Sequence, residues 1–510
     1  MNAIVNQDEL RKALVSSLTT SSEDIARDIM AKAGMRPDLI EKAITTGTGL
    51  VAYDLQAPAK NLYPVNTPLI KMIPRVGGGV GTATNWRQVN GITGSGFDNS
   101  GWVPEGQRAG QMSYNTSNRS ASYCTIGEED QATWEAISAG RTFEDIQATM
   151  TTRLLQKMML KEEMAVLAGN NSMALGTPAT PTLSQSGSGS LGNATYSVIV
   201  VALTLEGYRN SSLAGGVATS KTVTGADGKT FSLNGGSSQK SANATLAVTG
   251  GQNLFATTTA IQGAVGYAWF VGTAGSEKLE AITYINSVAF TTALAGTHQA
   301  VSAVTADCST NTLAYDGLLT SALKSGSGAV INALATGTAG TGTPLTASGK
   351  GSVNEIDSLM QSLWDQYQVG VDLILVNSQQ LKDITTKCLS NGSAPLLQYF
   401  QNPADGEVKL TAGAGIDFYY NPFLNGGMKT RIMIHPQVPP GTILGWASNL
   451  PIQYQSNEVP NVAEMKVRRD YYQVDWPVTT RAQMVGVYAE EVLAVYAPFA
   501  MTALTNVAAG

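Results

Sequence analysis

The strongest constraint in this sequence is a long helical pattern that begins near residue 142, in RTFEDIQATMTTRLLQKMMLKEEMAVLAGNN. Apolar side chains recur every four residues at Ile146, Met150, Leu154 and Met158. Thr142, with Asp145 three residues later, fits an N-cap, and Gly169 supplies a stop. The pattern predicts a helix from Thr142 to Ala168, about 26 residues and roughly 39 Å long, which would be the longest rigid element of the chain.

The region before this helix predicts a long hairpin. Residues 75–125 alternate polar and apolar side chains, with glycines at the bends. The expected tip, GSGFDNSGWVPEGQ, is polar apart from Phe97 and Trp102. Such a hairpin is not stable alone in water, so we expect it to lie against another subunit. Short helices predicted between Asp8 and about Ile44 would likewise rest on a neighbouring surface.

The composition changes after Asn170, where charged residues become sparse as far as Gly349. Short strands such as TYSVIVVALTLEGY and GYAWFVGTAG alternate with turns rich in Gly, Ser, Thr and Asn. We interpret about residues 175–305 as an inserted β-sandwich. Its later strands look like those of a fibronectin type III or immunoglobulin-like module, with Trp269 as the expected core ring.

A mixed α/β pattern returns at Ser352. The segment SVNEIDSLMQSLWDQYQ predicts a helix capped by Ser352, with Glu355 three residues on. Its apolar stripe is Ile356, Leu359, Leu363 and Tyr367. The apolar run VDLILVN predicts a strand buried on both faces, and SQQLKDITTKCL predicts a second helix capped by Ser378. Together they indicate an α/β layer.

Near the C-terminus, VRRDYYQVDWPVTTR (467–481) predicts a strand with one buried side. One face would carry Tyr472, Val474, Trp476 and Val478, and the other Tyr471, Gln473, Asp475 and Thr479. Tyr, Trp and Arg are also typical of binding hot spots. This segment is therefore a candidate interface strand.

Composition excludes several functional classes. Charged residues make up 14% of the chain, against about 25% in typical soluble domains, which indicates a polar, uncharged surface or one covered by partners. The net charge is −6 without a basic block, so the electrostatic footprint of a nucleic-acid binder is missing. The longest apolar run, SVIVVALTL, is about half a membrane span, and the N-terminus is charged. We expect a soluble protein that no conventional signal exports.

The residues that usually carry chemistry are few and scattered. Cys124, Cys308 and Cys388 show no CxxC spacing, which fits a reducing compartment and argues against disulfides or a zinc site. His298 and His435 fall in different expected domains, and we interpret each as a surface or satisfied residue.

Glycine-rich VGGGVGT (76–82) matches neither a dinucleotide-binding fingerprint nor a P-loop, and GxSxG is missing. Two acidic clusters, Glu128, Glu129 and Asp130, and Glu490 and Glu491, are interpreted as solvated faces. We predict no catalytic, cofactor-binding or metal-binding residues, no cofactor and no enzymatic activity.

The order of these parts resembles the major capsid protein of tailed bacteriophages, the Hong Kong 97-type fold, in the α+β class. The implied domains are an N-terminal arm (1–72), an extended E-loop hairpin (73–128), a P-domain with its spine helix (129–172), an inserted immunoglobulin- or fibronectin-like sandwich (173–308), an A-domain (309–466) and C-terminal P-domain strands (467–510).

This resemblance implies a protein that self-assembles, through hexamers and pentamers, into the icosahedral head shell of a tailed phage around double-stranded DNA. Its place would be the virion capsid, assembled in the host cytoplasm, without a membrane and with only non-specific proximity to DNA. A decoration or cement protein, a scaffold and a portal are further partners that the resemblance allows. Tyr472, Val474 and Trp476 would pack under the long helix, and Arg468, Arg469, Asp470 and Asp475 would meet adjacent subunits.

Two departures from the family limit what is carried over. No lysine lies between Met72 and Gln156, so we expect no isopeptide cross-link from the hairpin. Residues 1–44 are short for a cleaved scaffolding segment, and we expect no maturation cleavage. The insert is expected to project outward. Three alternatives remain: an encapsulin-type nanocompartment shell, a phage tail-tube or sheath protein, and a secreted or surface enzyme with a fibronectin-like module.

Overall fold

The structure is a computed structural model of the chain. It describes residues 66–93, 101–111, 113–141, 145–225, 228–349, 351–389, 398–401, 408–411, 416–424, 427–450, 461–478 and 480–510. The helices expected between Asp8 and Ile44 lie outside the described residues, as do Phe97, Thr142 and Thr479. The described chain combines a few helices with many strands, which confirms the α+β class.

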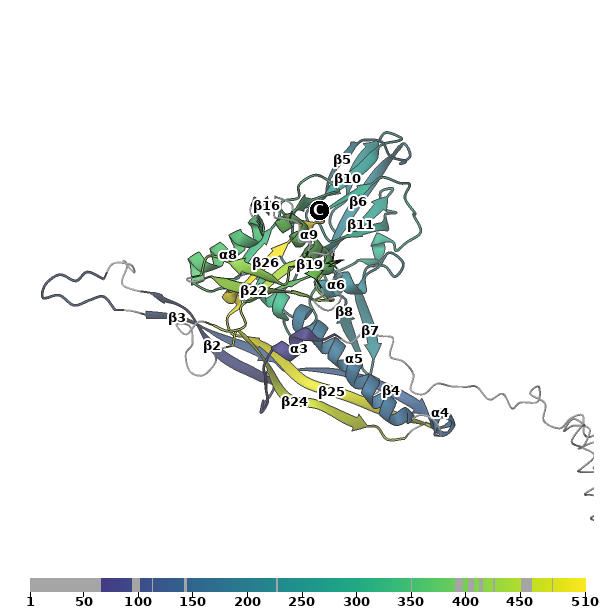
Figure 1. The fold of residues 1–510 in the computed structure, drawn as a ribbon. Helices are drawn as coiled ribbons and strands as arrows, with labels where there is room; N and C mark the ends of the chain where they lie inside the picture. The colour runs from purple at the N-terminus through teal and green to yellow at the C-terminus, as the bar shows by residue number, and fades with distance from the viewer. Residues whose placement is uncertain are drawn as a thin grey trace, which may run out of the picture. The chain divides into compact units, whose positions relative to one another are not determined.

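A four-stranded sheet supports the longest helix (Figure 1). Its strand order is β1 (Arg75–Val76), β24 (Ala463–Asp475), β25 (Ala482–Val495) and β4 (Cys124–Thr133). β1 runs parallel to β24, and the other two pairs are antiparallel. Helix α5 (Ile146–Ala168) packs on β4 and β25. It also contacts two short helices, α3 (Pro68–Met72) and α4 (Trp134–Gly140). The buried residues of this contact are Ala132, Met150, Leu154, Met158, Val485, Val487 and Ala489.

The ends of α5 are set by local hydrogen bonds. The Asp145 carboxylate accepts bonds from the backbone N–H groups of Gln147 and Ala148, so Asp145 is the N-cap and the prediction of Thr142 in that role is wrong. Gly169 ends the helix as predicted, and its N–H donates to the carbonyl of Ala165. A Cβ at Gly169 would collide with the Tyr315 carbonyl, which explains the glycine.

The predicted hairpin is present but shorter than expected. β2 (Ala83–Thr93) and β3 (Ser113–Ser122) form a two-stranded antiparallel sheet with a register irregularity between Val89 and Gly91. The flanking segments leave the hairpin, because β1 pairs with β24 and β4 pairs with β25. The paired strands therefore span 83–93 and 113–122, and the predicted bounds of 75–125 are too wide.

Residues 182–290 form two sheets that share a core. The three-stranded sheet is β13 (Ser287–Phe290), β10 (Asn253–Thr257) and β5 (Thr182–Ser186). The four-stranded sheet is β12 (Lys278–Thr283), β11 (Gly266–Gly272), β6 (Ala194–Leu203) and β9 (Ala244–Val248). Trp269 is fully buried between the sheets, as predicted, and its Nε1–H donates to Thr283 Oγ1 at 2.8 Å.

The four-stranded sheet of this region is covered on both faces. Val198 and Val200 of β6 face the core shared with β10, while Ile199 and Val201 face a second apolar cluster. A strand buried on both faces has no polar side, which accounts for the continuous apolar run in β6. The remaining elements here are α6 (Leu205–Asn210), β7 (Ser220–Thr224), β8 (Thr230–Asn234) and η4 (Val301–Ala303).

A six-stranded mixed sheet forms the second large layer (Figure 1). Its order is β14 (Val330–Ala333), β26 (Met501–Thr505), β23 (Ile443–Trp446), β18 (Leu373–Val376), β22 (Met428–Ile434) and β21 (Phe418–Asn421). Its helices are α7 (Leu318–Leu323), α8 (Asn354–Tyr367) and α9 (Ser378–Leu389). Short elements complete the layer: β15 (Thr343–Pro344), β16 (Ala347–Ser348), β17 (Ser352–Val353), β19 (Gln398–Gln401), β20 (Val408–Thr411), β27 (Val507–Ala508) and η6 (Pro498–Ala500).

The predicted α/β pattern is confirmed in this layer, but both predicted caps are wrong. All four residues of β18 are buried, and Ile356, Leu359 and Leu363 form the buried stripe of α8. Ser352 belongs to β17, and α8 begins without a side-chain cap. In α9 the backbone N–H of Gln379 donates to the side-chain oxygen of Asn377. Asn377 therefore caps the start of this helix, the role that was expected of Ser378.

Strand β24 turns toward the long helix the face opposite to the one that the resemblance implies. Its pairing with β25 shifts between Val467 and Arg469 and again between Arg469 and Tyr472. Tyr471 faces α5, whereas Tyr472 lies over β25, with its ring 5.9 Å from that of Tyr488. Trp476 is 42% exposed. The expectation that Tyr472, Val474 and Trp476 pack under the long helix is therefore wrong, because the strand turns its other face, which carries Tyr471, toward α5.

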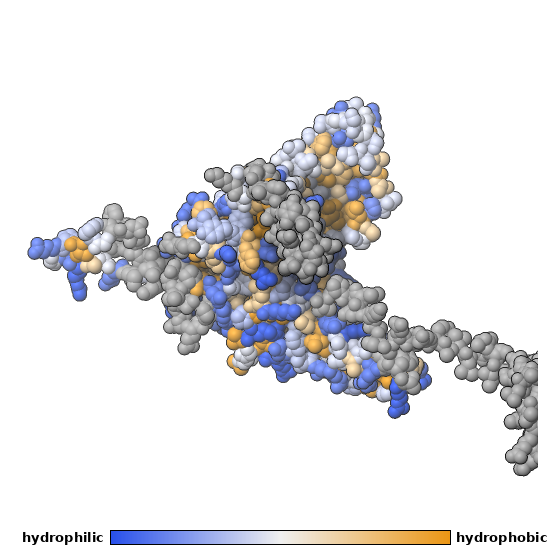
Figure 2. All heavy atoms as spheres, viewed as in Figure 1, coloured by the Kyte–Doolittle hydropathy of each residue, from blue (hydrophilic) through white to orange (hydrophobic). Residues whose placement is uncertain are grey.

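On the face drawn in Figure 2, hydrophobic residues lie in groups among pale and blue ones. Among the described helices, none has the length and apolarity needed to cross a membrane.

Candidate functional site

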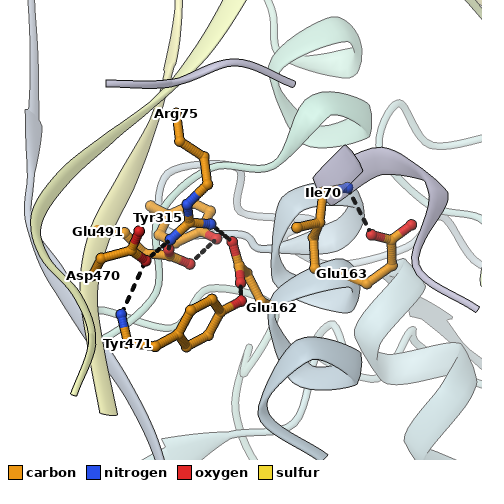
Figure 3. Close-up of polar contacts among 8 residues, drawn as sticks. All are labelled: Ile70, Arg75, Glu162, Glu163, Tyr315, Asp470, Tyr471 and Glu491. Atoms are coloured by element: carbon orange, nitrogen blue, oxygen red, sulfur yellow. Dashed lines mark hydrogen bonds and ion pairs between the residues drawn. The ribbon is translucent and has the colours of Figure 1, made fainter. Parts of the chain in front are cut away.

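A cluster of charged and phenolic side chains lies where four elements meet (Figure 3). Arg75 comes from β1, Glu162 from α5, Asp470 and Tyr471 from β24, Glu491 from β25, and Tyr315 from the segment before α7. We call these six residues the Arg75 cluster. Its members are far apart in the sequence, so only the folded chain can assemble it.

The guanidinium of Arg75 is the centre of the cluster. It forms ion pairs with Glu162, with Asp470 Oδ1 at 2.6 Å and with Glu491 Oε2 at 3.2 Å. Its Cζ lies 5.1 Å from the centre of the Tyr471 ring, within range of a cation–π interaction. One cation therefore holds strands β1, β24 and β25 and helix α5 together.

The two phenols complete the hydrogen bonding of the buried carboxyl groups. Tyr471 donates its hydroxyl to Glu162, and Tyr315 donates to Glu491 Oε1 at 3.3 Å. The side chains of Glu162 and Glu491 are both completely buried, while that of Asp470 is 62% exposed. Two buried carboxyl groups thus share one guanidinium.

This arrangement shifts the pKa of several groups. Burial, followed by the charge of Glu162, raises the pKa of Glu491 to about 8, although Arg75 opposes the shift. Burial also raises the pKa of Glu162. Burial and the nearby Glu491 carboxylate raise the pKa of Tyr315 well above its usual value. Cys124, which pairs with Glu491 in the ladder of β4 and β25, has its pKa raised to about 11, mainly by burial.

A second buried contact lies beside the cluster on α5. The Glu163 carboxylate accepts bonds from the backbone N–H groups of Leu69, at 2.8 Å, and Ile70, at 3.0 Å, at the start of α3. It also contacts His435 Nε2 at 2.7 Å, and both side chains are fully buried. Since the Gln437 N–H donates to His435 Nδ1, the ring hydrogen is on Nε2 and points at Glu163. Glu163 therefore caps a helix that lies far from it in sequence.

Neither glutamate was recognised from the sequence, although Glu162 carries a usable signal. The stripe that includes Met150, Leu154 and Met158 reaches Glu162 when the interval of four is continued. A charged residue in a buried stripe indicates a buried partner, because an unpaired buried charge is costly. No comparable signal points to Arg75 or Tyr315.

The acidic residues noted in the sequence have structural partners. Glu128 pairs with Lys161, and Glu129 accepts the hydroxyl of Tyr488. Glu490 pairs with Arg468 at 2.6 Å. The prediction of a solvated face fails for both Glu490 and Glu491, which are buried, Glu491 completely so in the Arg75 cluster.

The two histidines are separate in the structure. His298 Nδ1 lies 3.0 Å from the Leu279 carbonyl oxygen in the sandwich, while His435 is satisfied by Glu163. Within the described ranges no group of three or more His, Cys, Asp or Glu side chains is arranged to hold a metal ion. The three cysteines are free thiols.

The charged residues of β24 that were expected at subunit contacts already have partners within the chain. Arg468 donates to the Gly81 carbonyl at 2.8 Å and pairs with Glu490. Arg469 lies over the Tyr472 ring, with its Cζ 5.7 Å from the ring centre, and Asp470 belongs to the Arg75 cluster. Their role at contacts between subunits stays a prediction.

A polar cavity of about 430 Å³ adjoins the Arg75 cluster. It is lined by Trp86 and Arg119 of the hairpin and by Tyr315, Asp316 and Lys324. Tyr315 belongs both to this lining and to the cluster, so the cavity approaches the buried Glu491.

Comparison with known proteins adds a likeness of fold. No protein-family model matches the sequence, and no curated protein matches it. Solved structures do resemble it. The neighbours include phage capsids.

The capsid of a native GTA particle is 10% identical, with 91% of this chain and 97% of that one covered and a TM-score of 0.41. The capsid of Myoviridae phage XM1 is 10% identical over 91% and 100%, with a TM-score of 0.40. The holo-SrpI encapsulin complex from Synechococcus elongatus PCC 7942 is 9% identical over 88% and 93%, with a TM-score of 0.36.

Proposed function

We propose that the chain is the major capsid protein of a tailed bacteriophage, which self-assembles through hexamers and pentamers into an icosahedral head shell around double-stranded DNA. The observation that carries this proposal is the hairpin of β2 and β3. Its two strands pair with each other and with no further strand among the described residues. A single two-stranded hairpin is at best marginally stable in water, so this one requires a surface to lie on.

The tip of the hairpin supports the same interpretation. Trp102 is 92% exposed, and its neighbour Val103 is 45% exposed. Large aromatic side chains are enriched in the buried centres of protein interfaces. We infer that Trp102 becomes buried against another copy, and that repetition of this contact by symmetry supplies the cohesion of the shell.

The base of the hairpin is suited to such a role. β1, which precedes β2, is fixed to β24, β25 and α5 through the Arg75 cluster, while β4, which follows β3, is part of the same sheet. A rigid base allows every copy to present its hairpin in the same direction, which closed symmetric assembly requires.

Further parts of the proposal follow from the domain layout. The arm (1–72), hairpin (73–128), P-domain segments (129–172 and 467–510) and A-domain (309–466) would form the shell, with the sandwich (173–308) exposed on its outer side. Assembly would take place in the host cytoplasm. The low charge of the chain would let large polar surfaces meet without desolvating many ions.

Negative-stain electron microscopy of the purified chain, with nucleic-acid content measured by the ratio of ultraviolet absorbances, tests the proposal. We expect closed icosahedral shells, or hexamers and pentamers that convert to them. Shells from infected cells that hold protein cargo and no DNA would favour the encapsulin alternative, and helical filaments would favour a tail-tube or sheath protein. A uniform monomer at high concentration would contradict all three.

A further inference from the structure

We propose that the Arg75 cluster is a proton-controlled latch: Glu162 and Glu491 hold one proton between them at neutral pH, and its loss loosens β1 from α5 and β24. The inference concerns the folded chain itself and holds whatever the chain assembles into. It assigns a function to two buried carboxyl groups that the proposed shell contacts do not use.

The first argument is the balance of charge. Arg75 is the cation that contacts both Glu162 and Glu491, and the side chains of these glutamates are fully buried. If both were ionised, two buried negative charges would share one positive charge. Asp470 adds a third carboxylate, but its exposure lets solvent screen it. A proton on the Glu162–Glu491 pair restores neutrality in the buried part.

The second argument is that the remaining neighbours of Glu491 cannot supply the missing positive charge. The groups that face it are Arg75 from β1, Glu162 from α5, Asp470 and Tyr471 from β24, Tyr315 from the segment before α7, and Cys124 from β4. The pKa of Tyr315 and that of Cys124 are both raised, so these groups are neutral at pH 8 and below. Asp316, which follows Tyr315, is acidic, and its charge contributes to the raised pKa of Cys124.

The third argument is the effect of the two carboxyl groups on each other. The charge of Glu162 adds to burial in raising the pKa of Glu491, so Glu491 is the group that keeps the proton. Two neighbouring buried carboxyl groups disfavour each other's ionised form, which leaves one of them protonated. With the pKa of Glu491 at about 8, the proton is present at neutral pH and leaves in mildly alkaline solution.

The latch acts on β1 because few backbone hydrogen bonds hold this strand to β24. β1 has only two residues, and the flanking backbone bonds are Met465 N–H to the Pro74 carbonyl at 2.9 Å and Gly79 N–H to the Val467 carbonyl at 3.2 Å. Arg75 is the side chain that fastens it to α5 and β25. When the Glu162–Glu491 pair becomes doubly negative, the two carboxylates repel each other and push α5 and β25 apart. Arg75 can then no longer contact both glutamates, and β1 is held less firmly. The base of the hairpin is then freed, because β2 begins shortly after β1.

The sign of the pH dependence follows from the raised pKa. In the unfolded chain Glu491 titrates near 4.5, and in the folded chain near 8. The folded chain therefore binds more protons between these values, so its stability is greatest below about 4.5 with respect to this group and declines as the pH rises through 8. This is the reverse of the usual behaviour of a salt-bridged carboxylate.

Infrared difference spectroscopy of the full chain between acidic and alkaline pH measures the proton directly. We expect the signal of a protonated carboxyl group that disappears with a midpoint near pH 8 in the wild type. Glu491→Gln and Glu162→Gln each leave one buried carboxylate for Arg75, and both should lack this signal. Either variant alone suffices if the other does not fold. Glu135→Gln, whose side chain is 62% exposed, is the matched control and should retain the signal.

Hydrogen exchange tests the mechanical consequence. Protection factors are used because they correct for the faster intrinsic exchange at higher pH. Those of the Met465 and Gly79 amides should fall by about tenfold or more between about pH 6 and about pH 9 in the wild type. They should stay level in Glu491→Gln. The proposal is overturned if no carboxyl group titrates above about pH 6, or if the wild type and Glu491→Gln have the same exchange profile.

Discussion

At the scale of single residues, Glu163 shows how one carboxylate can join three parts of the chain. It accepts two backbone bonds from the first turn of α3 and one from His435, all in a fully buried setting. A helix N-terminus is a favourable place for negative charge, which lowers the cost of burying this one. Its removal would leave several donors without partners.

We therefore expect Glu163→Ala to lower the free energy of unfolding by about 3 kcal/mol or more, since each buried donor left unpaired costs about 1–3 kcal/mol. Glu163→Gln, whose amide oxygen still accepts hydrogen bonds, should cost less. Denaturant titration of the unassembled chain measures both, with Glu135→Ala as a control expected to change stability by less than about 0.5 kcal/mol. Equal losses for Glu163→Ala and Glu135→Ala would contradict the role of Glu163.

At the scale of elements, helix α5 was the most predictable part and β24 the least. Side chains every four residues predicted α5, because burial against a sheet requires one apolar stripe. Its cap was misplaced by three residues, since both Thr142 and Asp145 are acceptable capping residues and only the fold selects one. The face of β24 that packs on α5 was assigned wrongly, because aromatic side chains stand on both faces of its second half and period two does not say which face the helix covers.

The same reasoning explains what was missed in the site. Period and composition identify apolar faces, but they cannot pair Arg75 with Glu491, which is over four hundred residues away. The interaction of Tyr315 with the cluster likewise depends on the chain returning from the sandwich. Only the charged end of the α5 stripe, at Glu162, could have been read in advance.

Two adjacent leucines of α5 provide a matched test of its packing. Leu154 is 4% exposed and contacts the sheet, whereas Leu155 is 39% exposed. Leu154→Ala should lower the free energy of unfolding by about 2–5 kcal/mol, as cavity-forming substitutions do, and Leu155→Ala by less than about 1 kcal/mol. Thermal or denaturant unfolding distinguishes them. A similar loss in both variants would show that α5 does not pack as described.

At the scale of the whole molecule, a substitution at the hairpin tip allows effects on folding and on assembly to be measured separately. Because Trp102 is almost completely exposed, Trp102→Ala should leave the unfolding midpoint of the unassembled chain unchanged. If Trp102 is buried between copies, the same variant should raise the protein concentration needed for assembly at least tenfold, as loss of an aromatic hot spot worth about 2 kcal/mol implies.

Light scattering against protein concentration measures this effect. Val80→Ala serves as the control, because Val80 is 82% exposed but lies before the paired strands, away from the tip. If Trp102→Ala assembles at the same protein concentration as the wild type, Trp102 is not part of the contact between copies.

The position of β26 has a consequence for the timing of synthesis. This strand lies inside the six-stranded sheet, between β14 and β23, and pairs Val330 with Thr502. At about 5–20 residues per second, a ribosome needs roughly 10 to 30 s to travel from one of these partners to the other. Until then the edge strand β14 has no neighbour in the sheet. A chain interrupted before residue 502 cannot link β14 to β23, so this layer forms only when synthesis is nearly finished.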